Sequence, residues 1–194
     1  MSLKFVLLGL LSYGPDSGYS LHKRFLEPGR PKLSQVYRTL KEMAAEGLIT
    51  ATREQQEKLP ARNLYCLTRK GRLEFQRWMA SPWKVAPVKE HLLLKLAFSA
   101  KGKKKSVIAG MNTFIAGKKQ ELAYYQSTAK ELIKRQAQGR DALDLFYWEL
   151  FVNFLERRCQ AELEWAEESL VKIISEGPTE AEAPSAPRPA RKRR

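Results

Sequence analysis

The most regular pattern of apolar and polar residues in this chain of 194 residues begins at Leu33. Its apolar positions recur with the spacing of one helix face: Leu33, Val36, Leu40 and Met43. Polar side chains occupy the opposite face: Ser34, Gln35, Arg38 and Lys41. The pattern predicts an amphipathic helix that packs on one side, presents hydrogen-bonding groups on the other and ends at Gly47.

Two short apolar runs follow this helix, at residues 48–51 and 64–67. They flank a polar segment, REQQEKLPARN, that contains Arg53, Lys58 and Arg62. This arrangement predicts a β-hairpin with a basic tip. A polar-faced helix followed by such a hairpin is typical of a winged helix-turn-helix, in which the helix reads the major groove of DNA and the wing contacts its backbone. Double-stranded DNA is therefore the first partner to expect.

Two helices are expected before this motif. The first follows an apolar stripe at Leu3, Val6, Leu7, Leu10 and Leu11. It should stop before Gly14 and Pro15. Asp16 or Ser17 can cap a second helix over residues 18–27, which the segment PGRPK then breaks.

A fourth helix is expected after the wing, from a cap at Thr68 through Ala80, with Leu73, Trp78 and Met79 as its apolar contacts. Residues 1–80 thus form one predicted winged-helix domain of order α-α-α-β-β-α. Residues 81–88 read as a linker because prolines stand on both sides of Trp83. An apolar helix over residues 89–100 should follow, closed by lysines 101 and 103–105 in a solvated loop.

Long helices dominate the predicted second domain, residues 89–175. Alternating steps of three and four residues join positions that are apolar except Lys118: Ile108, Met111, Ile115, Lys118, Leu122, Tyr125, Ala129 and Leu132. A second helix over 142–175 has its own stripe: Leu143, Phe146, Leu150, Phe154, Cys159, Leu163, Ala166, Leu170 and Ile173. Such seams resemble coiled coils and favour a partner subunit, so we expect a homodimer that places two recognition helices on a palindromic site.

The fold class expected from these patterns is mostly α with a small β-hairpin: an N-terminal winged helix-turn-helix and a C-terminal dimerisation domain of long helices. The formal net charge is +14, but it is regional: +7 over residues 1–80, +6 over 81–105 and −1 over 106–175. A basic surface attracts phosphate, whereas a uniform solubility strategy would not leave one large segment neutral. The last stretch, 176–194, is rich in Pro and Ala and ends in a basic cluster, which predicts a disordered tail.

The sequence gives little support for a membrane protein or an enzyme. The apolar run in MSLKFVLLGLLSYG is too short to cross a bilayer and has no cleavage site, so no membrane association and a cytoplasmic location are expected. Cys66 and Cys159 lie in separate apolar patterns, which favours buried thiols. His22 and His91 stand in no metal or catalytic spacing, so we expect neither an enzyme, nor a metal site, nor a cofactor.

The chain resembles the PadR family of bacterial transcriptional regulators, in its long form with a helical C-terminal region related to virulence activators. The resemblance rests on six segments in series: LLGLL at 7–11, GP at 14–15, GYSL at 18–21, VYRTL at 36–40, EGLI at 46–49, and YCLT at 65–68 with Gly71. It implies a homodimeric, sequence-specific repressor, often relieved by a small molecule. A protein-binding winged helix, or an accessory module that binds DNA without sequence preference, is the alternative.

The family's DNA surface maps onto Tyr19, Ser34, Gln35, Tyr37 and Arg38, and onto the wing. The helical pattern adds Lys41 to the same face, and Lys58 and Arg62 are the phosphate contacts expected in the wing. The wing departs from the usual family pattern because Glu54 and Glu57 stand beside its basic residues. Three alternatives remain: Arg38 lies on an ordinary solvated helix face, the Tyr37 ring merely packs against the first helix, and the wing cations only balance the local glutamates.

A pocket for a small aromatic effector is a further hypothesis. Trp148, Phe151 and Trp165 could line it, because flat aromatic walls suit planar organic ligands. Packing in the core or at a dimer interface is the usual explanation for such residues.

Overall fold

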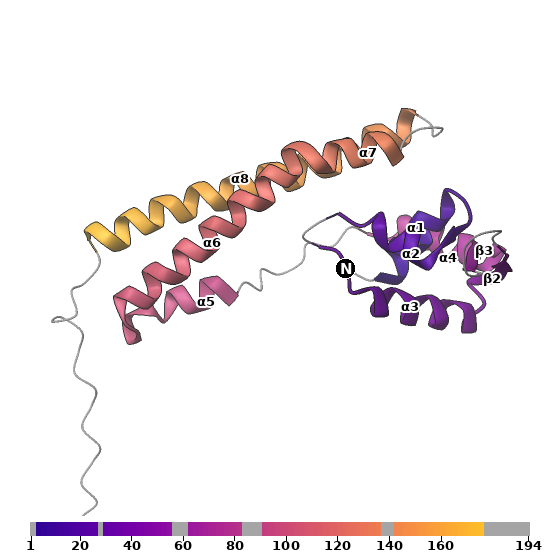
Figure 1. The fold of residues 1–194 in the computed structure, drawn as a ribbon, viewed down its shortest axis with the longest axis horizontal. Coiled ribbons are helices and arrows are strands. Elements are labelled where there is room, and N and C mark those ends of the chain that lie inside the picture. The colour runs from indigo at the N-terminus through magenta and orange to yellow at the C-terminus, as the bar shows by residue number, and fades with distance from the viewer. Residues whose placement is uncertain (1–2, 27–28, 56–61, 83–90, 137–141, 177–194) are drawn as a thin grey trace, which may run out of the picture. The chain divides into compact units, whose positions relative to one another are not determined.

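The computed structural model describes residues 3–26, 29–55, 62–82, 91–136 and 142–176 (Figure 1). The chain divides into two units, Met1–Val85 and Ala86–Arg194. The first contains α1 (Leu3–Ser12), β1 (Asp16–Ser17), α2 (Gly18–Lys23), α3 (Leu33–Ala45), β2 (Ile49–Glu54), β3 (Arg62–Leu67) and α4 (Arg69–Met79). The second contains α5 (His91–Ala97), η1 (Ser99–Lys101), α6 (Lys104–Tyr124), η2 (Tyr125–Ala129), α7 (Lys130–Gln136) and α8 (Ala142–Ser175). The predicted fold class is confirmed, with one addition to the sheet.

That addition is β1, which the sequence analysis missed. The sheet has three antiparallel strands in the order β1-β3-β2, and Asp16 pairs with Tyr65 in the added strand. A strand of two residues is too short to show a period of two. Its charge is satisfied locally, since Asp16 Oδ2 lies 2.7 Å from Arg24 Nη2 and its Oδ1 accepts the backbone N–H of Ser17.

The second helix is shorter than expected. Ser17 rather than Asp16 caps it, because the Ser17 hydroxyl accepts the N–H of Ser20. The helix ends at Lys23 instead of residue 27, and Arg24 and Phe25 donate to carbonyls only three residues back, as in a tightened last turn. Arg30 then donates to the Phe25 carbonyl through Nε and Nη2 and holds the turn before α3.

Side chains from all parts of the first unit meet in one core. The buried apolar residues are Leu7, Leu8, Leu10, Leu11, Leu21, Val36, Leu40, Met43, Leu48, Ile49 and Tyr65. Trp78 of α4 stacks on Phe5 of α1 at a centroid distance of 4.9 Å and on Phe75 at 5.9 Å. Leu73 and Met79, expected beside Trp78 in this packing, are exposed, and Trp78 itself is 44% exposed despite its stacking. Phe75 also lies on the face of α4 that meets α1, beside Gly9.

The junction between α3, the wing and α4 is a close backbone contact. Gly47 follows α3 with a φ of +72°, the left-handed conformation that favours glycine after a helix. The Thr68 hydroxyl donates to the carbonyls of Gly47 and Leu48, at 2.8 and 3.0 Å, and accepts the N–H of Gly71. This contact joins the end of α3 to the end of β3.

The C-terminal unit is an antiparallel pair of long helices, α6 against α8 (Figure 1). Most of the predicted seam on α6 and η2 is buried: Met111, Ile115, Leu122, Tyr125 and Ala129. It packs within the chain on residues of α8, namely Val152, Cys159, Leu163 and Ala166. The expectation that this seam needs a partner subunit is therefore wrong, since the chain folds back and covers it.

Two local features of α6 also differ from expectation. Lys104 and Lys105 begin the helix instead of lying in a loop, and Lys104 Nζ donates to the carbonyl of Ile174 near the end of α8. The π-helical turn η2 inserts extra backbone, so Ile133 rather than Leu132 is the buried residue after Ala129. A strict heptad count cannot foresee this shift.

The apolar residues of α8 divide between two faces. Its N-terminal half exposes a group that we call the α8 apolar face: Leu143, Phe146, Tyr147, Leu150, Phe151 and Phe154. At 3.6 residues per turn, this group points roughly opposite to Val152, Cys159, Leu163 and Ala166, which contact α6. A single chain cannot cover both faces with one neighbouring helix.

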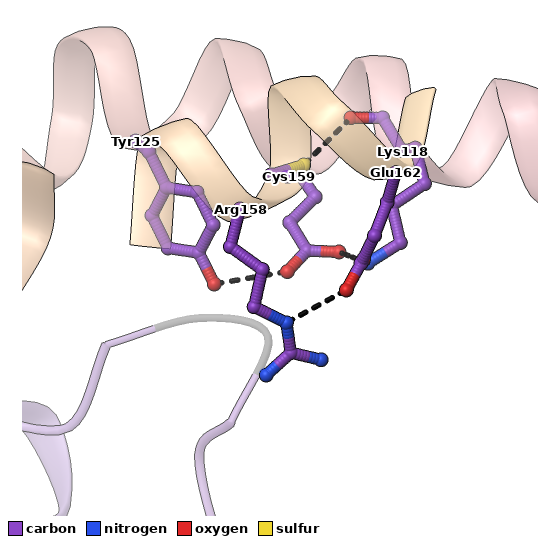
Figure 2. Close-up of polar contacts among 6 residues, drawn as sticks. Lys118, Tyr125, Arg158, Cys159 and Glu162 are labelled. Atoms are coloured by element: carbon purple, nitrogen blue, oxygen red, sulfur yellow. Dashed lines mark hydrogen bonds and ion pairs between the residues drawn. The ribbon is translucent and has the colours of Figure 1, made fainter. Parts of the chain in front are cut away.

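A polar network interrupts the apolar seam at Lys118 (Figure 2). Lys118 Nζ pairs with Glu162 and, at 2.8 Å, with Glu121, whose other oxygen accepts the Tyr125 hydroxyl at 3.0 Å. Arg158 Nε lies 2.7 Å from Glu162, and the Cys159 thiol donates to the Lys118 carbonyl. The side chains of Lys118, Glu121 and Glu162 are 16–21% exposed. The ions are thus paired where solvent screens them incompletely.

Charge partners outweigh burial in setting the pKa values of Lys118 and Glu162. Burial alone would lower the pKa of Lys118, but bonds and charges from Glu121 and Glu162 raise it above 10.5. Burial alone would raise the pKa of Glu162, but Lys118 and Arg158 hold it below 4.5. For Tyr125 and Cys159, burial raises the pKa, and negative neighbours add to the effect. Both of these groups are therefore kept neutral as hydrogen-bond donors.

Replacement of Gly71 by alanine should destabilise the first unit. The added Cβ would lie 2.1 Å from the Leu48 carbonyl oxygen, and because the obstacle is backbone, no side-chain rotation relieves it. We expect Gly71→Ala to lower the free energy of unfolding by about 1–3 kcal/mol in chemical denaturation. Gly110→Ala is the control, since its Cβ would meet nothing within 4 Å and alanine favours a helix. Equal stability of the two variants would contradict this packing.

The network should make stability depend on acid through Glu162. Because its folded pKa is lowered, its contribution is present above pH 4.5 and is lost as the pH falls through the folded pKa. We expect Glu162→Gln to cost about 1–3 kcal/mol at neutral pH, and to flatten the loss of stability in that acid range. Thermal melts from pH 7 to 3 measure both effects. Glu164→Gln, an exposed position on the same helix, should leave the pH profile unchanged.

Candidate nucleic-acid interface

The rotation of α3 about its axis defines the candidate interface. Val36, Leu40 and Met43 are 0% exposed and anchor one side of the helix in the core. Residues on the opposite side are exposed: Ser34, Arg38, Lys41, Glu42 and Ala45. The structure thus brings three of the predicted DNA-binding residues, Ser34, Arg38 and Lys41, onto one solvent-facing surface.

The entry to α3 is held by three polar contacts. The Gln35 side-chain oxygen accepts the N–H of Lys32 at 2.9 Å, which satisfies a donor at the start of the helix. His22 Nε2 donates to the carbonyl of Pro31 at 3.0 Å, and Arg30 holds the Phe25 carbonyl. Gln35 is therefore partly used in capping its own helix, and its amide nitrogen is the end that remains for an external acceptor.

Arg38 and Glu42 form a pair one turn apart on this surface. Arg38 Nε lies 3.8 Å from Glu42 Oε1, and the side chains are 73% and 62% exposed. An exposed pair of this kind contributes little to stability and exchanges readily for another partner. Sequence analysis placed Arg38 here but did not consider the carboxylate beside it, although the spacing of four residues indicates the pair.

Tyr37 packs on α2 more closely than the sequence suggested. A Cβ on Gly18 would lie 2.5 Å from Cε1 of the Tyr37 ring, so only glycine leaves room for the ring there. The packing alternative named the first helix, whereas the contact given by the structure is with the start of α2. Tyr37 is still 43% exposed, so one edge of the ring faces solvent.

The start of α2 presents a second aromatic and a cation. Tyr19 is 53% exposed, and Lys23 Nζ lies 4.6 Å from the centre of its ring. Sequence analysis did not name Lys23 as a site residue. Its distance of four residues from Tyr19 is the signal that places both on one helix face.

The wing strands pair in register from Ile49 with Leu67 to Glu54 with Arg62. Arg62 Nε lies 2.6 Å from Glu54 Oε2 across the strands, so this cation is balanced locally in the free protein. Arg53 is exposed on the neighbouring position. Lys58 and the rest of the wing tip, residues 56–61, lie outside the described residues.

The three aromatic residues of the effector hypothesis do not come together. Trp148 and Phe151 form an edge-to-face pair with centroids 5.8 Å apart. Trp165 lies fourteen residues beyond Phe151 on the same helix, about 21 Å along its axis. The structure therefore offers two of these residues as neighbours, and the effector pocket stays a prediction.

A fixed helix with a polar, cationic face beside a small sheet defines the class of winged-helix proteins that contact nucleic acid. Two family models match the chain in tandem: the transcriptional regulator PadR-like family over residues 7–77, and the virulence activator alpha C-terminal domain over 88–173. Among the described residues, no helix has both the length and the apolarity of a membrane crossing.

Three comparisons agree with these models. The negative transcriptional regulator PadR of Bacillus subtilis is 34% identical over 101 residues, which are 50% of this chain and 56% of that protein. The match thus spans little more than half of the relative's length. The crystal structure of B. subtilis PadR in complex with operator DNA has a TM-score of 0.73 at 26% identity, covering 88% of this chain and 97% of that one.

The structure of the same B. subtilis protein in complex with p-coumaric acid has a TM-score of 0.67 at 26% identity, covering 89% and 98% of the two chains. The chain belongs to the PadR-like family of transcriptional regulators, in the form with a virulence-activator C-terminal domain. The resemblance expected from the sequence is confirmed, and the family consists of regulators rather than enzymes.

Proposed function

We propose that this protein is a transcriptional repressor that binds a palindromic DNA operator as a homodimer. The observation that carries the proposal is the fixed rotation of α3, which buries Val36, Leu40 and Met43 and exposes Ser34, Arg38 and Lys41. An α-helix fits the major groove of DNA, where donors in the N-terminal half of α3 reach base edges. The operator complex of B. subtilis PadR supports the same target for this chain.

Each exposed residue has a role in this proposal. Ser34 and the amide of Gln35 donate near the start of α3, where the helix dipole favours phosphate. The guanidinium of Arg38 donates two hydrogen bonds to one guanine, and Lys41 contacts the DNA about one turn further along α3. Beside α2, the DNA backbone is contacted by Tyr19, Tyr37 and Lys23. On the other side it is contacted by the wing, through Lys58 and Arg62. The protein binds chromosomal DNA in the cytoplasm.

The homodimer rests on the α8 apolar face. Its residues are 39–62% exposed within one chain, and a contiguous apolar surface of this kind usually marks an interface. The proposed second subunit covers that face through a two-fold axis, because identical copies offer identical patches. This replaces the sequence-based argument from the α6 seam, which is filled within the chain.

A small planar organic molecule is the proposed effector that relieves repression. Two observations support it: the p-coumaric acid complex of B. subtilis PadR, and the neighbouring rings of Trp148 and Phe151, whose flat faces suit contact with a planar ligand. Trp165 belongs to this proposal only if the second subunit brings it near, because it is distant along α8.

Arg38→Ala tests the DNA-binding role. We expect operator affinity to fall by about 1–3 kcal/mol, with preference relaxed at one base position, because a bidentate contact to a base is lost. Fluorescence anisotropy with the DNA fragment upstream of the protein's own gene, against single-base variants, measures this. Arg135→Ala is the matched control, since Arg135 is 76% exposed and pairs with Glu131 one turn away in the other unit. An unchanged binding profile for Arg38→Ala would contradict the assignment.

Phe154→Glu tests the homodimer. A charge on the α8 apolar face should dissociate the dimer, because burial of an unpaired carboxylate opposes association. We expect sedimentation equilibrium to give the monomer mass, near 22.3 kDa, while the wild type sediments as twice that mass. Asn112→Glu on the exposed side of α6 should leave the dimer intact. A Phe154→Glu variant that still sediments as a dimer would place the interface elsewhere.

A further inference from the structure

An acidic residue lies on the surface that is proposed to enter the major groove. Glu42 follows Arg38 by one turn and Lys41 by one residue, and its side chain is 62% exposed. DNA phosphates repel a carboxylate, so its presence on this face opposes binding to any duplex. A residue that weakens binding in general needs a separate explanation.

The fold does not supply that explanation. Glu42 lies in the last turn of α3, where the helix dipole disfavours a negative charge. Its pair with Arg38 has the less favourable order, with the cation on the N-terminal side, and the 3.8 Å separation is longer than a direct hydrogen bond. Neither the helix nor the core of the first unit therefore depends on this carboxylate.

The effect of Glu42 on Arg38 is local and directional. Its carboxylate attracts the guanidinium toward the C-terminal end of α3, along the surface of the helix. A phosphate contact must compete with this attraction and with the repulsion between phosphate and Glu42. A guanine edge carries no net charge, so Glu42 does not repel it as it repels a phosphate, and its two acceptors fit the planar guanidinium. The contact with guanine is therefore weakened less than the contact with phosphate.

We propose that Glu42 is a positioning residue that makes the proposed operator recognition selective. It pairs loosely with Arg38 in the free protein and repels phosphates near α3, which lowers the affinity of the helix for unrelated sequences, so that Arg38 contributes fully only at a matching base. The inference rests on the proposed DNA-binding function, which it deepens. It assigns specificity to a residue that contributes no attraction to DNA.

The pair between Glu54 and Arg62 in the wing provides a contrast. Their atoms lie 2.6 Å apart, and the glutamate likewise neutralises an arginine on a candidate DNA-contacting element. The wing is proposed to contact backbone, which is the same in every duplex. Removal of Glu54 should therefore strengthen binding to all sequences by a similar factor, whereas removal of Glu42 should strengthen binding to unrelated sequences selectively.

The test compares E42Q, E42D, E54Q and the wild type on two duplexes of equal length, the fragment upstream of the protein's own gene and a shuffled sequence. We expect E42Q to bind the shuffled duplex about 3–10-fold more tightly, with a steeper salt dependence, and the operator fragment with little change. The E42D variant keeps the charge and should retain most of the wild-type discrimination. E54Q should strengthen binding to both duplexes by a similar factor, so the ratio of the two affinities stays near the wild-type value.

Glu131→Gln serves as the remote control, because Glu131 is 67% exposed and pairs with Arg135 in the second unit, and it should change neither affinity. The inference is overturned if E42Q strengthens both duplexes equally, or if it leaves both unchanged. Those results differ from failure of the proposed function, in which the wild type itself shows no preference for the operator fragment.

Discussion

The buried stripe of α3 is the constraint on which the rest of the candidate interface depends. Val36, Leu40 and Met43 have no solvent exposure, so the helix cannot rotate about its axis without exposing apolar area to water. The direction in which Ser34, Arg38 and Lys41 point is therefore set by the core rather than by their own contacts. Close packing of the apolar side gives the polar side a fixed presentation, which recognition of base edges requires.

A small number of polar side chains hold both ends of α3 in place. Gln35 caps the start, while His22 and Arg30 hold the turn before it. At the other end, Thr68 bonds to the carbonyls of Gly47 and Leu48, so the wing and the recognition helix share one anchor. In the second unit, the network around Lys118 fixes how α6 lies on α8, since a slip of one turn would separate partly buried charges from their partners.

Sequence patterns predicted the first unit well because its helices are amphipathic and its breaks contain glycine and proline. The exposed face of α3 followed directly from the 3.6-residue period. The short strand β1 escaped detection because it has two residues. The spacing of four residues indicates the pair of Arg38 with Glu42, and the glutamates of the wing were noted beside its cations, but the structure is needed to show that Arg62 pairs with Glu54. The second unit was harder, since an apolar seam does not reveal whether its partner is in the same chain. The π-helical turn at Tyr125–Ala129, which shifts burial from Leu132 to Ile133, has no periodic signature.

Affinity cleavage from α3 tests the account's central claim most directly. In a Cys66→Ser background, an iron chelate would be attached to Ser34→Cys, because Ser34 is exposed and Cys159 is buried. The account predicts two clusters of cleavage in the upstream fragment, in successive major grooves about one helical turn apart, and none from a chelate on Asn112→Cys. Absence of cleavage from Ser34→Cys, despite specific binding of the fragment, would contradict the claim that this face of α3 enters the groove.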